Sequence, residues 1–265
     1  MTEHDDGLER WGGHLVDPDV YELDTPRDNH NKREVLQVTY TLSPEPIRNW
    51  LVAANKYDYL GFDTEARPQT IRGAPRNPTA LLQLARPDGA VLLLNWDQLS
   101  VSAQDRIGGP LSALLANPHI LKLGSASRQD FREVVDDWDL DIDSTAKHQP
   151  CGCVDIATLA RADASRFVSV DNSTPVVGKD GVPRVPVIKC GLAALADRYL
   201  DGVKLEKSVA RADWAQPFPM SDDMIAYAAL DAWAGCRVFE AMCEGMDSRS
   251  LRYRLREQGV SNWRM

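Results

Sequence analysis

The sequence has few cysteines and no long hydrophobic run, and each lack excludes a class of protein. Its five cysteines are an odd number scattered through 265 residues, which argues against a disulfide framework. No apolar run reaches the ~18 residues that a transmembrane helix needs, and the polar segment 1–35 does not resemble an export signal. We therefore expect no membrane association, and an intracellular protein of the cytoplasm or nucleus.

Positive charge is also scarce, since the formal net charge is −9. The excess is uneven: residues 1–36 carry ten acidic and four basic side chains, whereas the remainder carries 29 acidic and 26 basic ones. This balance argues against a basic protein that coats duplex nucleic acid. The balance still permits an enzyme that binds the end of a nucleic-acid strand, because bound cations would reverse the local electrostatic field around acidic ligands.

The chain divides by composition into three parts. Residues 1–35 are acidic with few apolar anchors, and we predict that they are largely disordered. With 43% hydrophobic residues the chain can bury a sizeable core, which we place in a domain over residues 36–245. Residues 163–187 contain three prolines and two glycines, a composition that predicts a long loop, which we place near the functional site. Residues 246–265 form a basic tail.

Alternating strand-like and helix-like segments predict an α/β fold, a mixed sheet with helices packed on it. Pro87-Asp88-Gly89 predicts a hairpin turn between two of the strands. Strands are expected at 35–40, 59–65, 80–84, 90–95, 120–124 and 153–156, and helices at 44–56, 102–115, 128–138, 190–200 and 221–244.

Asp63 and Glu65 are two residues apart on the strand predicted at 59–65. Alternate residues of a strand share a face, so both carboxylates point the same way. Like charges held this close raise each other's pKa unless a cation neutralises them. The pair indicates a metal site, although it could also decorate the exposed end of a strand.

Asp130 follows Gly124-Ser125-Ala126-Ser127 near the start of the helix predicted at 128–138. If Ser127 is the N-cap, Asp130 occupies the third helical position, where a carboxylate completes a capping box and interacts favourably with the helix dipole. Taken alone, this structural role is the stronger interpretation.

Tyr227 and Asp231 are four residues apart and share one helical face. Five alanines nearby would let this helix approach a sheet closely, so an ordinary packing helix is the alternative. Combined, four carboxylates and one tyrosine could meet at one sheet edge. Carboxylates are ligands for Mg²⁺ or Mn²⁺, and two such ions can activate water and stabilise the leaving oxygen of a phosphodiester.

Several ordered segments resemble one family, the DEDDy-type 3′→5′ exonuclease domain shared by ribonuclease D and the Werner-syndrome exonuclease. The resemblance covers residues from about 36 to 245. It is carried by Gly61-Phe62-Asp63-Thr64-Glu65, by Lys122-Leu123-Gly124 with Asp130, by Gly191-Leu192-Ala193-Ala194-Leu195, by Arg211-Ala212-Asp213-Trp214 with Pro219, and by Tyr227-Ala228-Ala229-Leu230-Asp231-Ala232.

The resemblance implies a ribonuclease H-like fold and a two-metal nuclease acting on nucleic acid with a free 3′ end. It implies that Asp63, Glu65 and Asp231 hold one Mg²⁺ or Mn²⁺ ion, that Asp63 also reaches the second, and that Asp130 completes the site through water. Tyr227 would position the attacking water. Ala226 stands where the sister subclass has histidine, which implies the tyrosine type.

Weaker signals surround this set. Arg67, Arg72 and Arg76, in the loop after the first motif, and Arg128 are candidate contacts to a phosphate backbone, with a solvated loop as the alternative. The five arginines of residues 247–265 could contact nucleic acid or simply follow a helix C-terminus.

A zinc site could involve His148, Cys151 and Cys153, but no second pair of cysteines or histidines has suitable spacing. Trp214 is interpreted as a packing residue rather than a base-stacking platform.

The leading hypothesis is a metal-dependent 3′→5′ exonuclease that releases nucleoside 5′-monophosphates from single-stranded RNA or DNA, with RNA weakly favoured. The alternative is a catalytically silent nucleic-acid- or protein-binding module on the same fold, because a fold does not determine a function. An interaction role for the acidic residues 1–35 could coexist with either. The intact acidic set favours the enzyme.

Overall fold

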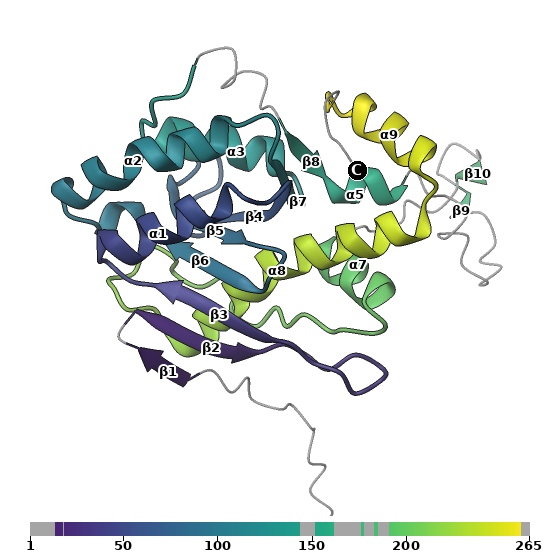
Figure 1. The fold of residues 1–265 in the computed structure, drawn as a ribbon, viewed down its shortest axis with the longest axis horizontal. Helices are drawn as coiled ribbons and strands as arrows, with labels where there is room; N and C mark the ends of the chain where they lie inside the picture. The colour runs from purple at the N-terminus through teal and green to yellow at the C-terminus, as the bar shows by residue number, and fades with distance from the viewer. Residues whose placement is uncertain are drawn as a thin grey trace, which may run out of the picture.

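The computed structural model describes residues 14–17, 19–143, 152–161, 176–177, 183–184 and 191–260. Within these residues, eight strands form one mixed sheet in the order β1-β2-β3-β6-β5-β4-β7-β8 (Figure 1). The expected α/β sheet with flanking helices is confirmed. The strands are β1 (His14–Asp17), β2 (Val20–Asp24), β3 (Val35–Tyr40), β4 (Tyr59–Ala66), β5 (Thr79–Ala85), β6 (Ala90–Leu94), β7 (Leu121–Gly124) and β8 (Cys153–Asp155).

Strand β4 lies near the middle of the sheet, antiparallel to β5 and parallel to β7, which in turn is parallel to β8. The predicted hairpin joins β5 to β6, which pair antiparallel. Gly89 adopts a φ of +86°, a left-handed conformation that glycine tolerates best, and the Asp88 carboxylate accepts the Ala90 N–H at 3.2 Å. The turn chemistry therefore sets the register of the strand pair beside β4.

The sheet separates two hydrophobic cores because successive strand residues point to opposite faces. Leu60 and Phe62 of β4 lie in the core beneath α1, α2 and α3, whereas Leu121 and Leu123 of β7 lie in the core beneath α5, α7, α8 and α9. No described helix is long and apolar enough to cross a membrane. The helices are α1 (Pro44–Ala54), α2 (Val101–Ala116), α3 (Ser127–Asp137), α5 (Ile156–Arg161), α7 (Leu192–Tyr199), α8 (Asp222–Gly245) and α9 (Ser248–Glu257).

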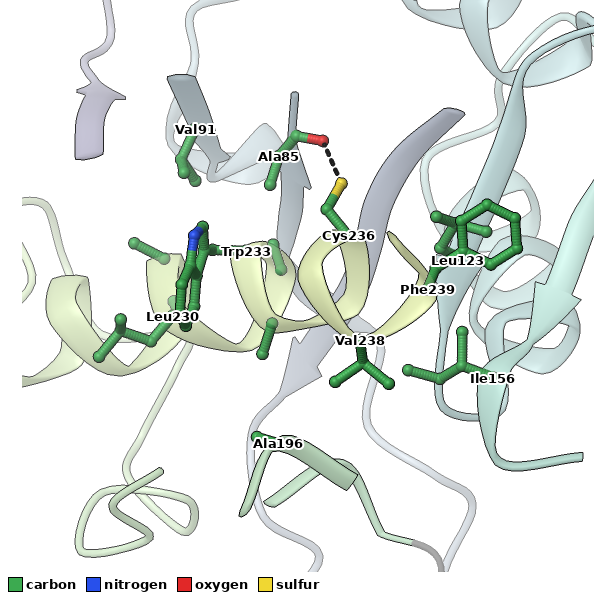
Figure 2. Close-up of a cluster of buried hydrophobic side chains, with 14 of the residues drawn as sticks. Ala85, Val91, Leu123, Ile156, Ala196, Leu230, Trp233, Cys236, Val238 and Phe239 are labelled. Atoms are coloured by element: carbon green, nitrogen blue, oxygen red, sulfur yellow. Dashed lines mark hydrogen bonds between the residues drawn. The ribbon is translucent and has the colours of Figure 1, made fainter. Parts of the chain in front are cut away.

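The long helix α8 runs across one face of the sheet (Figure 1). Figure 2 shows its buried side chains between the strands and α7, with Cys236 Sγ donating a hydrogen bond to the carbonyl of Ala85 at 3.3 Å. The helix begins where the Ser221 hydroxyl accepts the Met224 N–H at 3.4 Å. Alanines on its sheet side allow close packing, as the sequence indicates.

Gly61 of β4 lies directly against the backbone of α8. A Cβ atom added at this position would lie 1.9 Å from the carbonyl oxygen of Ala232, a clash that only backbone movement could relieve. Ala232 follows Asp231 directly, and Gly61 precedes Asp63 by two residues. The glycine of the first motif therefore sets the distance between the two elements that carry acidic side chains.

The structure differs from the sequence-based expectations at both ends of the chain. The expected disorder of residues 1–35 does not hold over β1 and β2, and Leu23 of β2 is buried. Residues 1–13 lie outside the described part. The basic tail expected at 246–265 contains α9, whose Leu251 and Leu255 are buried. Apolar residues at the spacing of a strand or a helix, too few to be conspicuous, account for both differences.

The loop predicted at 163–187 falls mostly outside the described residues. Its described parts are Val176–Val177 (β9) and Pro183–Arg184 (β10), which pair antiparallel as a separate two-stranded sheet. The length of this loop and its position near the functional site stay predictions.

Candidate active site

Helix α8 and strand β4 bring three of the predicted carboxylates together. Asp63 and Glu65 lie on β4, and Asp231 lies on α8. One carboxylate oxygen from each residue lies within 4.8 Å of the other two. The shared orientation predicted for Asp63 and Glu65 is consistent with this, because Leu60 and Phe62 of the same strand are buried in the opposite core.

The three carboxyl groups have raised pKa values. Burial is the largest cause for each of them. The neighbouring charges of Asp231 and Asp130 help to raise the pKa of Glu65 to about 8. The pKa of Asp63 lies well above its usual value, and that of Asp231 is raised to about 6. In the absence of a cation, this cluster cannot hold its full negative charge at neutral pH.

Asp130 is close to this cluster but is not one of its three members. It lies in the first turn of α3. Its pKa is raised to about 7, chiefly by burial and then by the charge of Glu133, while a side-chain hydrogen bond with Thr64 lowers it. Its own charge in turn raises the pKa values of Asp63 and Glu65. Asp130 thus belongs electrostatically to the site.

The capping role considered for Asp130 is wrong. The N-cap of α3 is Ala126, in the left-handed conformation with a φ of 65°, so Ser127 is the first helical residue. The Ser127 hydroxyl is buried and has no hydrogen-bond partner within the described residues. Asp130 therefore stands one position beyond that of a capping box. The sequence placed the helix correctly to within one residue, and that single residue removes the capping box. Asp130 keeps its place in the first turn of α3, where a carboxylate interacts favourably with the helix dipole, and its predicted part in metal binding stays a prediction.

Tyr227 lies one turn before Asp231 on α8, and its side chain hydrogen-bonds to the Asp231 carboxylate. Burial, followed by the charges of Asp231 and Glu65, raises its pKa above the usual value, so the phenol stays protonated and can donate. Its ring packs against Trp214, with centroids 5.7 Å apart. Trp214 is fully buried, which confirms its interpretation as a packing residue.

Two further residues at the site were not identified from the sequence. Gln83 of β5 stands directly opposite Asp63, is fully buried, and lowers the pKa of Glu65, although its amide atoms form no hydrogen bond of normal geometry among the described residues. A polar residue inside the apolar run of β5 was an available signal. Lys207 is exposed, and its charge lowers the pKa of Asp231. No motif marks Lys207 in the sequence.

The donor set fits divalent cations. Carboxylate oxygens from Asp63, Glu65 and Asp231 converge without a cationic side chain among the ligating atoms, and hard oxygen donors suit Mg²⁺ or Mn²⁺. The amide oxygen of Gln83, buried beside them without a partner in the described part of the chain, is a further polar atom that an ion or its water could satisfy.

The four arginines predicted to contact nucleic acid differ in their surroundings. Exposed Arg67 forms an ion pair with Asp213 at 2.8 Å, and Arg76 forms a two-pronged pair with Asp137 at 2.7 and 2.8 Å. Arg72 is exposed, and Arg128 is partly buried at the start of α3. Two of the four guanidinium groups are therefore already engaged by carboxylates, and the role predicted for all four stays a prediction.

The zinc alternative depends mostly on residues outside the described part of the chain, where His148 and Cys151 lie. Cys153 is buried in β8. The zinc alternative therefore stays untested.

Comparisons with known proteins identify the family of the chain. A family model described as 3'-5' exonuclease matches residues 41–247. The chain belongs to this family of exonuclease hydrolases. It is 29% identical to ribonuclease D of Haemophilus influenzae over 124 residues, which are 47% of this chain and 23% of that protein. The match thus spans about a quarter of the length of this curated relative.

Solved structures show the same fold. The catalytic core of RRP6 from Trypanosoma brucei superposes with a TM-score of 0.58 at 15% identity, covering 94% of this chain and 68% of that one. Ribonuclease D of Trypanosoma brucei in complex with RNA U12 gives a TM-score of 0.58 at 14% identity, covering 86% of this chain and 71% of that one. The expected ribonuclease H-like fold is confirmed.

Proposed function

We propose that this protein is a metal-dependent 3′→5′ exonuclease that hydrolyses the terminal phosphodiester bond and releases nucleoside 5′-monophosphates. The observation that carries the proposal is the meeting of Asp63, Glu65 and Asp231 from two elements within 4.8 Å. Burial raises the pKa of each carboxyl group in this cluster, so the cluster destabilises the folded chain in the absence of a cation. Groups with pKa values perturbed in this way are typical of functional sites. Family membership supports the same conclusion.

The residues then have distinct roles. Asp63, Glu65 and Asp231 would hold one divalent cation, Asp63 would also reach a second, and Asp130 would complete the site through water. Two Mg²⁺ or Mn²⁺ ions supply a nucleophilic water and charge stabilisation for the leaving oxygen. The protonated Tyr227 hydroxyl, held by Asp231 and by the Trp214 ring, orients the attacking water beside the scissile phosphate.

The substrate is a single strand with a free 3′ end, and we favour RNA over DNA. The structural relative solved with RNA U12 supports RNA as the substrate, and Ribonuclease D of Haemophilus influenzae, by its name, acts on RNA. Discrimination between the two sugars requires a contact to the 2′-hydroxyl. The candidate contacts Arg67, Arg72, Arg76 and Arg128 would act on phosphates, which both nucleic acids share.

Cleavage of end-labelled strands tests the proposal. Single-stranded RNA and DNA labelled at the 5′ end should give a ladder that shortens from the 3′ end in Mg²⁺ or Mn²⁺, faster for RNA, and none in EDTA. Strands labelled at the 3′ end should release labelled mononucleotide at once. Internal fragments would indicate an endonuclease, and binding without any cleavage would support the silent-module alternative instead.

A further inference from the structure

Helix α9 has two unlike faces. Leu251 and Leu255 are buried in the core that lies beneath α8. Three arginines and a tyrosine, spaced by three, four and seven residues from the first, share the opposite face. This arginine face, which lines a shallow depression together with Ser248, consists of Arg249, Arg252, Tyr253 and Arg256. All four side chains are exposed, and Tyr253 is 63% exposed.

The carboxylates beside the arginine face are engaged by other groups of the helix, although the charge of Arg249 helps to lower the pKa of Asp247. Asp247 accepts the backbone N–H groups of Arg249 and Ser250, both at 3.0 Å, and thereby caps the helix. Glu257 accepts the hydroxyl of Tyr253. Among the residues that the structure describes, no carboxylate lies within ion-pair distance of the guanidinium groups of Arg249, Arg252 or Arg256. A protein with a net charge of −9 thus carries three arginines on one helix face that form no ion pair within the described part of the chain.

The C-terminal end of α9 is hydrogen-bonded to β8, beside the candidate active site. The Gln258 side chain accepts the Asp155 N–H at 2.8 Å and donates to the Asp155 carbonyl at 3.2 Å. Asp155 ends β8, and its charge acts on Asp130. Figure 1 shows α9 beside α5 and β8, at the side of the sheet where α3 begins. A strand whose 3′ end reaches Asp63 could therefore continue across this helix.

We propose that the arginine face of α9 binds the sugar–phosphate backbone of a single-stranded nucleic acid, upstream of the 3′ end held at the candidate active site. The location of that 3′ end rests on the proposed function. Guanidinium groups bind phosphates through paired hydrogen bonds, and Tyr253 offers a ring on which a base can stack. Interleaved positive charge and aromatic surface is the combination by which single strands are bound without regard to sequence.

Salt-dependent binding tests the proposal. The Asp63→Asn background prevents cleavage, so a labelled oligouridylate of about 12 nucleotides can be followed by fluorescence anisotropy. Arg249→Gln/Arg252→Gln/Arg256→Gln should weaken binding and make the plot of log Kd against log salt shallower by about 2, since each phosphate contact to a single strand contributes about 0.7. The control, Arg48→Gln/Lys56→Gln/Arg106→Gln, removes the same number of charges from the side of α1 and α2, including Arg106, which is paired with Glu45, and should leave the slope unchanged.

Tyr253 separates base stacking from charge alone. Tyr253→Ala should weaken binding of oligouridylate and oligothymidylate several-fold without changing the salt slope, and Tyr253→Phe should restore it. Equal losses in the arginine variant and in the α1–α2 control would overturn the proposal. If the wild-type protein cleaves no strand but the arginine variant still loses binding, the proposed function fails and this surface stands. If the wild-type protein cleaves and the arginine variant binds normally, the proposed function stands and the proposed binding surface fails.

Discussion

The two halves of helix α8 carry partly buried charged side chains with different neighbours: opposite charges in one half and like charges in the other. In the C-terminal half, Arg237 donates to Glu240 at 2.6 Å and to Glu34, from the segment before β3, at 2.5 and 3.1 Å. The hydroxyl of Tyr59 also donates to Glu240, at 2.7 Å. In the N-terminal half, Asp231 faces two further carboxylates. The first cluster, which we call the balanced cluster, sets one guanidinium between two carboxylates, and the other is a set of like charges.

The difference shows which cluster serves the fold. The balanced cluster joins three segments through charge-assisted hydrogen bonds, and such bonds contribute to stability when both partners are present. The acidic cluster keeps like charges in a partly buried setting, which destabilises the folded chain in the absence of a cation. Carboxylates that lie together although they lower the stability of the fold indicate a functional site.

The largest effect should come from removing one acidic ligand. Asp231→Asn should lower exonuclease turnover by roughly 10³-fold or more, because it removes a charged ligand from a site whose ions stabilise the transition state by several kcal/mol. In metal-free buffer the same change should raise the melting temperature, since it relieves repulsion. Asp63→Asn should behave alike. Gel assays of cleavage and thermal unfolding measure both effects.

Arg237→Gln is the matched change in the balanced cluster. It should lower the free energy of unfolding by about 1–3 kcal/mol, because two carboxylates lose their partner, and leave turnover nearly unchanged. Wild-type cleavage by Asp231→Asn, or an inactive but stable Arg237→Gln protein, would contradict the assignment of roles to the two clusters.

A smaller effect is expected at Tyr227, which belongs to the acidic half of α8 but is not a ligand. Tyr227→Phe should lower kcat about 10²-fold, the size typical of lost proton-transfer or water-positioning groups, with Mg²⁺ affinity unchanged in calorimetry. The ring and its packing on Trp214 are kept, so stability serves as the control. A weakened response to metal with normal turnover would assign Tyr227 to ion binding instead.

The smallest effect is a pH dependence of stability without metal. The pKa values of Glu65 and Asp130 are about 8 and 7 in the folded chain, against roughly 4 when unfolded, so the folded state binds more protons between these values. Stability should therefore fall as pH rises from about 5 to 8, by at most about 1.4 kcal/mol per pH unit for each proton.

In EDTA the melting temperature should follow this decline, and Mg²⁺ should reverse it because the ion binds only the folded site. Glu65→Gln removes one of the titrating groups and should flatten the decline. The balanced cluster provides the comparison, since Arg237→Gln should lower stability by a similar amount at pH 5 and pH 8. A flat profile for the wild-type protein in EDTA would show that the carboxyl groups ionise freely.

Much of the fold and of the acidic set could be predicted because their signals are local. Alternation of apolar residues identified the strand of Asp63 and Glu65, and the turn before Ala90 identified the hairpin. The signals failed where an element depends on packing elsewhere: β2 is held by pairing with β3, and α9 by two leucines set against a distant part of the core. Short segments of this kind carry too few apolar residues to be recognised alone.

The sequence by itself determined the chemistry available to this protein: which carboxylates exist, which two share a strand face, and which tyrosine lies one helical turn from the last aspartate. Strand and helix periodicity are enough for that, because they relate only residues close in the chain. Only the tertiary structure decided that Asp231 meets Asp63 and Glu65 while Asp130 lies near them without joining the group of three, and that Gln83 of β5 faces Asp63 of β4 across the strand pair. These outcomes depend on how closely α8 approaches Gly61 and on the register between strands, and such distances are set by packing between segments far apart in sequence.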